Sequence, residues 1–539
     1  MTPSYHHFHS NTYPMKKSFL VMMAIMLAHV CGAQTPDDTA APLQPLHGMQ
    51  LKVETQVSAA EGVTPLWLNA NKHGLSSLEN FNGYLRAAVV RPLLTDSARK
   101  WGLGYGVDVA MPVNYTGDVV IHQAYAELRW LHGALTIGSK EYPMQLKNNT
   151  LSSGSQTLGI NARPVPQVRL SLPEYWTLPF TNGWVHVKGH LAYGMMTDEN
   201  WQKDFTHQQA KYTEGTLYHS KAGYLRIGGN NEFMPPLSLE LGLEMASTFG
   251  GRSYRVPVAD GVADVVHNQG GLRGMKNALM LAGSDQDEGV YHNAAGNQLG
   301  SWMARVNYDE DLWRLSAYID HFFEDHSQLY FLGKSGYGTG DRWNNRTNGL
   351  MVYNLKDMIL GVDLCLRYGT WLKNLVVEYI YTKDQSGPLY HDNTPNLPFK
   401  VSGIDNYYNH SIFTGWQHWG QVIGNPLFRS PVYNDDGVIE VRDNRFKAIH
   451  LAMDGQLGQL APWRYRLMAT CQSGVGTYFN PYTKAHHNIS LMAECCYAAD
   501  EGLLRGWLLK AAAGMDAGAI LGHNYGLQLT VSKHFRIGR

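Results

Sequence analysis

Two stretches of this chain concentrate the residue types that bind sugars. Residues 403–428 read GIDNYYNHSIFTGWQHWGQVIGNPLF, and residues 341–346 read DRWNNR. Tryptophan and tyrosine faces stack on the apolar faces of sugar rings, while asparagine and arginine donate hydrogen bonds to hydroxyl and carboxylate groups. We therefore predict a site for a neutral or acidic polysaccharide, with contacts from Arg342, Trp343, Asn345, Tyr407, Tyr408, Trp416 and Trp419.

The same aromatic side chains also suit a second role. Loops of this length can build a small hydrophobic core of their own and fold over their scaffold as a lid. The two roles are compatible, because some aromatic residues can pack while others face a ligand. For most of these residues packing is the role that we favour.

Catalytic and metal-binding motifs are not found. Glu240 and Glu244 could serve as paired acid and base, but charges of both signs that line a barrel commonly pair with each other. The chain has no HExxH and no GxSxG, and the glycine-rich run at 333–340 lacks the ending of a phosphate-binding loop. We predict no catalytic residues, no cofactor and no metal. With a net charge of −1, charge alone implies no nucleic acid partner.

The N-terminal residues resemble an export signal. Lys16 and Lys17 precede the apolar run at 18–30, which ends at Cys31-Gly32-Ala33. A basic segment, an apolar segment and a small-residue cleavage site define a secretory signal peptide. We predict a signal peptide over 1–33 that starts at Met15, and a lead-in over 34–48. A lipid-modified Cys31 is the less favoured alternative.

Composition then narrows the class of the exported protein. Charged residues make up 17% of the chain, glycine occurs 55 times and tyrosine 31 times. No later segment approaches the length of a membrane-spanning apolar helix. Exported chains with this composition include the transmembrane β-barrels of Gram-negative outer membranes.

Alternation supports that class. In 524–536, for example, Tyr525, Leu527, Leu529 and Val531 alternate with polar residues, as in a strand with one lipid-facing side. We predict eighteen such strands, give or take two, at 49–57, 82–91, 102–112, 119–131, 134–141, 165–172, 183–195, 217–228, 237–248, 300–308, 313–322, 356–367, 374–384, 445–455, 463–473, 487–498, 504–515 and 524–535.

The predicted connections sort by length. Those after even strands are short, and most of those after odd strands are long, with 113–118 as the clear exception. Short periplasmic turns opposite long extracellular loops are typical of bacterial barrels. We predict one all-β domain over 49–539, a transmembrane antiparallel up-and-down β-barrel in the outer membrane, with extracellular loops at 58–81, 142–164, 249–299, 323–355 and 385–444. A soluble, secreted all-β protein remains the alternative.

If the apolar face meets lipid, charged residues of the strands face the lumen. The pattern places nine of them there: Glu240, Glu244, Arg305, Asp320, Asp363, Arg367, Glu378, Lys510 and Asp516.

Four motifs carry a resemblance to a known family. PLWLNANKHG at 65–74, IGSKEY at 137–142, TLGINARPVPQVRLSLPEYW at 157–176 and the long motif at 403–427 resemble the Wzi-type capsule assembly family, in the form of its Bacteroidetes members. The resemblance implies an eighteen-stranded outer-membrane barrel that acts as a lectin and helps to attach capsular polysaccharide. Enterobacterial members carry an N-terminal helical bundle, whereas this chain shows no helical pair before residue 82. No catalytic residue carries over.

We therefore expect a non-enzymatic, lectin-like outer-membrane protein. Its expected partners are capsular or other surface polysaccharide, outer-membrane lipids and capsule export machinery. The alternatives are a porin or channel, and a secreted or outer-membrane carbohydrate-active hydrolase.

Overall fold

The computed structural model describes residues 46–96, 100–228, 235–258, 261–282, 295–324, 331–334, 347–351, 356–385, 404–458, 462–499, 502 and 504–537. Residues Leu46–Arg539 form one compact unit. The predicted signal peptide lies outside the described residues, and so do Arg342, Trp343 and Asn345.

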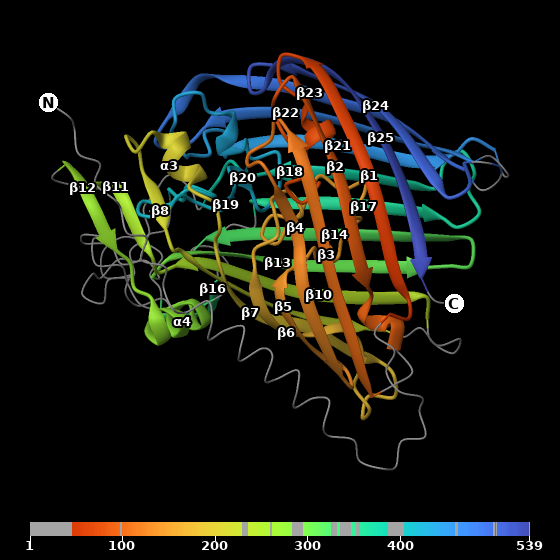
Figure 1. Cartoon of the computed structure of the whole chain (residues 1–539). Coiled ribbons are helices and arrows are strands. Elements are labelled where there is room, and N and C mark those ends of the chain that lie inside the picture. The colour runs from red at the N-terminus through yellow and green to blue at the C-terminus, as the bar shows by residue number, and fades with distance from the viewer. Residues whose placement is uncertain are drawn as a thin grey trace, which may run out of the picture. The chain divides into compact units, whose positions relative to one another are not determined.

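Eighteen antiparallel strands form a single sheet (Figure 1). They are β1 (Met49–Glu61), β2 (Phe81–Arg91), β3 (Trp101–Val113), β4 (Val120–Trp130), β5 (Gly133–Ser139), β6 (Gln167–Thr177), β7 (Val185–Met195), β9 (Leu217–Ile227), β10 (Leu237–Phe249), β13 (Asn297–Asp309), β14 (Trp313–Glu324), β17 (Met358–Leu366), β18 (Asn374–Tyr381), β21 (Phe446–Gln456), β22 (Trp463–Gly476), β23 (Pro481–Ala498), β24 (Trp507–Gly518) and β25 (Gly522–Ile537).

The sheet closes on itself. β1 pairs with β2 on one side and with β25 on the other, in a register that runs from Met49 opposite Ile537 to Glu61 opposite Tyr525. Closure removes the unpaired edges that an open sheet would expose. The predicted eighteen-stranded up-and-down barrel is therefore confirmed, strand for strand. The largest difference is at β23, which begins at Pro481 rather than at 487, because its pairing with β22 continues past a register shift near Gly476.

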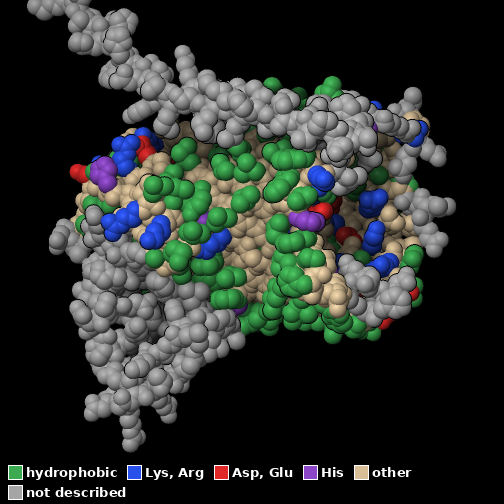
Figure 2. Space-filling view, turned by 90° about the horizontal axis from the view of Figure 1, so that it is seen from below, with side chains coloured by type: hydrophobic (Ala, Val, Ile, Leu, Met, Phe, Trp, Pro, Cys, Tyr) green, Lys and Arg blue, Asp and Glu red, His purple; other side chains and the backbone are tan. Residues whose placement is uncertain are grey.

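Alternation along the strands separates an apolar outside from a polar inside. On β25, Leu527 and Leu529 are 64% and 61% exposed, whereas Gln528 between them and Thr530 after them are buried. Figure 2 shows hydrophobic side chains spread over one side of this wall. Aromatic pairs lie beside three of the short turns, where an interfacial girdle is expected: Trp101 with Trp130, Tyr308 with Trp313, and Trp463 with Tyr497.

Connection lengths follow the predicted sorting with two further exceptions. The long connections at 62–80, 140–166, 196–216, 250–296, 325–357 and 382–445 all follow odd-numbered strands of the barrel, counted along the chain. The connections at 477–480 and 519–521 also follow odd strands but are short, because β22 to β25 themselves extend further and meet in tight hairpins.

The remaining elements lie in the long connections. They comprise β8 (Tyr212–Glu214), β11 (Arg252–Val258) and β12 (Gly261–His267), which form a three-stranded sheet; the pairs β15 (Phe331–Lys334) with β16 (Thr347–Met351) and β19 (Gln417–His418) with β20 (Gln421–Val422); and α2 (Leu66–Asn69), α3 (Trp201–Thr206) and α4 (Gly271–Met280). The 3-10 turns η1 (Leu93–Asp96) and η2 (Pro431–Tyr433) lie in the connections after β2 and β18.

Helices are short throughout the described part of the chain. Within it, no helix has both the length and the apolar character needed to cross a membrane. Before residue 82 the described residues contain one helix, the four-residue α2, and so no helical bundle.

Candidate ligand-binding site inside the barrel

Three segments from the long connections, 62–80, 140–166 and 404–445, pack against the inner wall of the barrel. Leu66, Leu151 and Trp416, one from each segment, belong to the same buried cluster as Phe322 and Ile380 of the wall. The principal hydrophobic core of this protein is therefore in the lumen, where inward-folded segments meet the strands.

Carboxylates on or beside the wall hold the backbone of these segments and of residue 385. When irregular backbone is buried on folding, its N–H groups need hydrogen-bond acceptors in place of water. A carboxylate can accept several such hydrogen bonds. Six such contacts recur: Leu66 N to Asp516 (3.0 Å), Ser153 N to Glu378 (2.7 Å), Gln156 N to Asp320 (3.1 Å), Leu158 N to Glu244 (3.2 Å), Gln385 N to Asp357 (2.6 Å) and Tyr408 N to Glu324 (2.6 Å).

Most of the predicted luminal charges are structural in this way or pair with each other. Arg305 lies 3.2 Å from Asp363, and Glu240 accepts a hydrogen bond from Asn307. The prediction that Arg367 faces the lumen is wrong. Arg367 follows the end of β17 and pairs with Asp309 in this short connection, where both side chains are nearly half exposed.

Tyr407, Tyr408, Trp416 and Trp419 lie in the plug, the name used from here for the three luminal segments 62–80, 140–166 and 404–445. Tyr407 and Trp416 are 0% exposed and Tyr408 is 1% exposed, whereas Trp419 retains 9%. The Trp416 indole N–H donates to the carbonyl of Thr157 at 2.9 Å. Protein therefore covers the faces of the first three rings in this structure, and their contact with a glycan stays a prediction.

A close approach at Gly424 fixes Tyr408. The Tyr408 hydroxyl donates to the carbonyl of Gln156 and accepts the N–H of Asn425 at 3.0 Å. A Cβ on Gly424 would lie 1.9 Å from that hydroxyl oxygen. Only glycine allows the 404–445 and 140–166 segments to meet here.

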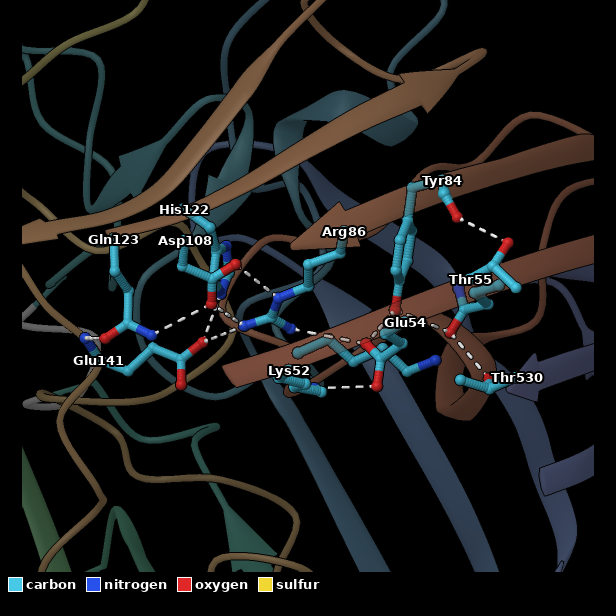
Figure 3. A network of polar contacts seen from close by, with 12 residues as sticks. Lys52, Glu54, Thr55, Tyr84, Arg86, Asp108, His122, Gln123, Glu141 and Thr530 are labelled. Atoms are coloured by element: carbon cyan, nitrogen blue, oxygen red, sulfur yellow. Dashed lines mark hydrogen bonds and ion pairs between the residues drawn. The ribbon is translucent and has the colours of Figure 1, made fainter. Parts of the chain in front are cut away.

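A polar network anchors the beginning of the 140–166 segment (Figure 3). Arg86 of β2 contacts Asp108 of β3 at 2.8 Å and Glu141 at 3.2 Å, and Glu141 also contacts His122. Burial opposes ionisation of Glu141, but the hydrogen bond to His122 and the nearby positive charges hold the pKa of Glu141 well below its usual range. The network thereby positions Lys140 and Tyr142 on either side of Glu141.

A cavity lies between this segment and the wall strands β6, β7, β9 and β10. Its empty space, counted together with the part that is open to solvent, is about 660 Å³. Its lining includes basic and aromatic side chains: Lys140, Tyr142, Arg163, Arg169, Tyr218 and Tyr224.

The two arginines of the cavity face aromatic rings. The Arg169 guanidinium lies 3.8 Å from the centroid of Tyr142, and that of Arg163 lies 4.1 Å from Trp419. Arg163 also donates to the carbonyl of Thr116. Burial lowers the pKa of Arg163 to about 10, so its side chain still carries a positive charge at neutral pH.

Two predicted aromatic residues support this lining from behind. Trp416 stacks on Tyr218 with ring centroids 5.8 Å apart, and Trp419 stacks on Arg163. Lys140, Tyr142, Arg163 and Arg169 were not predicted as site residues, although they lie in the motifs IGSKEY and TLGINARPVPQVRLSLPEYW. The signal in those motifs was their charged and aromatic content, but their convergence depends on tertiary folding.

No family model and no curated protein matches this sequence. A similar solved structure is Wzi of Escherichia coli, described as an outer-membrane protein involved in group 1 capsule assembly and as a carbohydrate-binding β-barrel. The two chains are 10% identical with a TM-score of 0.52, over 98% of this chain and 90% of Wzi.

Two further structures are OccD3 of Pseudomonas aeruginosa and OccAB4 of Acinetobacter baumannii. They are 10% and 8% identical, with TM-scores of 0.41 and 0.42, over 91% and 92% of this chain and 91% and 99% of theirs. The similarity to Wzi shows a shared barrel fold.

Proposed function

We propose that this protein is a non-enzymatic outer-membrane lectin that binds surface polysaccharide and helps to attach capsule. The observation that carries the proposal is the luminal cavity, in which tyrosine rings and arginine guanidinium groups converge. Ring faces and planar donors are the groups that recognise sugars. The barrel fold shared with Wzi, which is carbohydrate-binding, supports the same function.

The filled lumen favours binding over free diffusion. A porin of this size keeps an aqueous channel, whereas here three chain segments form a buried core inside the wall. Weak single sites would be offset by avidity, because many copies in one membrane can engage one long polymer.

The residues predicted to contact the polysaccharide have different roles in this proposal. Arg342, Trp343 and Asn345 are proposed contacts on the connection after β14, and Trp419 is proposed to contact the polymer beside Arg163. Tyr407, Tyr408 and Trp416 would reach a glycan through a rearrangement of the plug, because all three are buried in this structure. Trp416 also supports the cavity lining through its contact with Tyr218. Capsule export machinery is the proposed protein partner.

The test compares cells that lack the protein with cells that carry it. We expect surface polysaccharide to shift from the cell-bound fraction to the medium when the protein is lost, and purified protein to bind the extracted polysaccharide. Steady ion conductance in planar bilayers without polysaccharide binding would instead establish a porin. Turnover of the polysaccharide that Glu240→Gln or Glu244→Gln abolishes would establish a hydrolase.

A further inference from the structure

Arg169 is a charged side chain that lacks a charged partner. Among the residues that the structure describes, its guanidinium has no ion pair and no hydrogen bond, and its Nε is buried. Its close contact is the face of Tyr142, which satisfies none of its five donors in the plane of the group. Only the Nε of Arg169 is buried, so its terminal nitrogens, which line the cavity, are available to donate hydrogen bonds to an anion that enters it.

The carboxylates nearby are already engaged. Glu244, which lines the same cavity, accepts hydrogen bonds from the Tyr224 hydroxyl at 2.6 Å and from the Leu158 N–H at 3.2 Å. Glu127 pairs with Lys140 at 2.6 Å. Neither carboxylate lies within ion-pair distance of Arg169, and Arg163, whose charge Glu199 partly offsets, is a second cation on the lining.

The cavity is open to a ligand. Pro143 on its lining is exposed, and Tyr142 and Gln145 are partly exposed. A further cation, Lys188 of β7, lies at this side, where its ammonium group donates to the Gln145 side chain at 2.7 Å. A ligand that enters past these residues meets the in-plane donors of Arg169 and the rings of Tyr218 and Tyr224.

We propose that this cavity binds an anionic sugar residue of the hexuronic acid type, with its carboxylate on Arg169 and its ring against the tyrosines. A guanidinium recognises a carboxylate through two parallel hydrogen bonds, which fixes the orientation of the sugar as well as its charge. The inference rests on the proposed polysaccharide binding and names its ligand class.

The test uses purified, detergent-folded full-length protein and two matched probes. One is an oligosaccharide of alternating glucuronic acid and N-acetylglucosamine, and the other is the same oligosaccharide with its carboxyl groups reduced to alcohols. In calorimetry, the dissociation constant of the acidic probe should be at least about tenfold lower than that of the reduced probe. This is the range expected for one charged hydrogen-bonded contact.

The variants assign that preference to the cavity. Arg169→Gln should remove the difference between the probes, and Arg169→Lys should keep part of it. Arg464→Gln, which changes an exposed arginine on β22, should leave it unchanged. Heat-dependent electrophoretic mobility confirms that each variant has folded.

Several results would overturn the inference. The first is equal binding of the two probes, and the second is an unchanged preference in Arg169→Gln. The third is competition by inorganic phosphate: if phosphate displaces bound acidic probe at the same concentration as unlabelled acidic probe does, the site recognises a negative charge and not a sugar. If neither probe binds, extracted surface polysaccharide replaces them. Equal binding by wild type and Arg169→Gln then overturns the inference alone, whereas no binding overturns the proposed function as well.

Discussion

Trp416 is a buried aromatic residue beside the candidate site. It is fully buried, stacks on Tyr218 of the cavity and donates to the carbonyl of Thr157. Trp416→Ala should destabilise the plug by about 3–5 kcal/mol, the cost of an emptied core site. Trp416→Phe should cost less, about 1–3 kcal/mol, because it keeps the stacking and leaves one carbonyl unpaired.

Hydrogen exchange of the amides in 140–166 measures that effect. Trp371→Ala, at a position that is 67% exposed in a short connection, is the matched control and should change little. If Trp416→Ala instead leaves exchange unchanged and weakens polysaccharide binding, Trp416 is a direct contact, as the sequence predicts.

Asp357 makes the anchoring of the plug depend on pH. Burial raises its pKa from 3.8 to about 7, although the N–H groups of Asp384 and Gln385 and the Tyr407 hydroxyl favour the ionised form. A carboxyl group whose pKa rises on folding stabilises the folded state fully below pH 3.8. That contribution is lost as the pH rises through about 7.

The free energy of opening around Gln385 and Tyr407 should therefore fall as the pH rises from 3.8 to about 7. The slope is at most about 1.4 kcal/mol per pH unit for one proton. Hydrogen exchange, corrected for its intrinsic pH dependence, measures this energy. Asp357→Asn should flatten the profile, and a variant that kept the full slope would assign the titration to another group.

At the scale of elements, the 404–444 segment occupies the lumen but is not part of the barrel wall. β18 and β21 on its two sides pair directly with each other, so the wall does not depend on the segment. Replacing 404–444 by a short Gly/Ser linker should leave a folded barrel and open a path for ions. Planar bilayers should show conductance steps for this variant and none for the wild type.

Replacing α4 by the same linker is the control for that deletion. α4 follows β12 in a different long connection, and its loss leaves the three luminal segments in place. If the 404–444 variant shows no conductance in planar bilayers, the segments 62–80 and 140–166 suffice to block the lumen.

The strands were predictable because the alternation of apolar and polar residues within each strand shows which of its faces is apolar. The alternation around Leu527 and Leu529 needs no knowledge of distant residues, and the same holds for the other strands of the wall. The path of a long connection is different. Nothing local in 403–428 distinguishes a surface loop from a plug, because its burial depends on carboxylates such as Glu324 and Asp357 on or beside other strands.

The candidate site was predictable only in part for the same reason. Trp416 and Trp419 stand out by type, and they do lie beside the cavity. Arg163 and Arg169 become notable only when folding places one against Trp419 and the other against Tyr142. Among the described residues neither arginine has a carboxylate within 4 Å, and this is a tertiary fact that no spacing in the sequence encodes.

At the scale of the whole molecule, closure between β1 and β25 should make the barrel resistant to detergent. A closed sheet has no free edge from which strands can be removed one at a time. Unboiled protein should therefore migrate faster than boiled protein in SDS electrophoresis. Equal migration of the two samples from a soluble fraction would contradict a membrane barrel.

A membrane-spanning barrel predicts a cost of substitution that depends on depth along a single strand. Leu529 lies near the middle of β25 and Tyr525 nearer its end, and both are outward-facing and more than half exposed. Arginine on a lipid face costs about 2–4 kcal/mol at the bilayer midplane and about 0–1 kcal/mol near the interface.

Leu529→Arg should accordingly destabilise the barrel far more than Tyr525→Arg does. Reversible unfolding in lipid vesicles measures both energies, and the inward-facing neighbour Thr530 offers a control through Thr530→Ser, which keeps the hydroxyl. Equal small costs at Leu529 and Tyr525 would mean that water, not lipid, surrounds this wall. The gradient between the two positions therefore tests the membrane-spanning fold independently of any ligand.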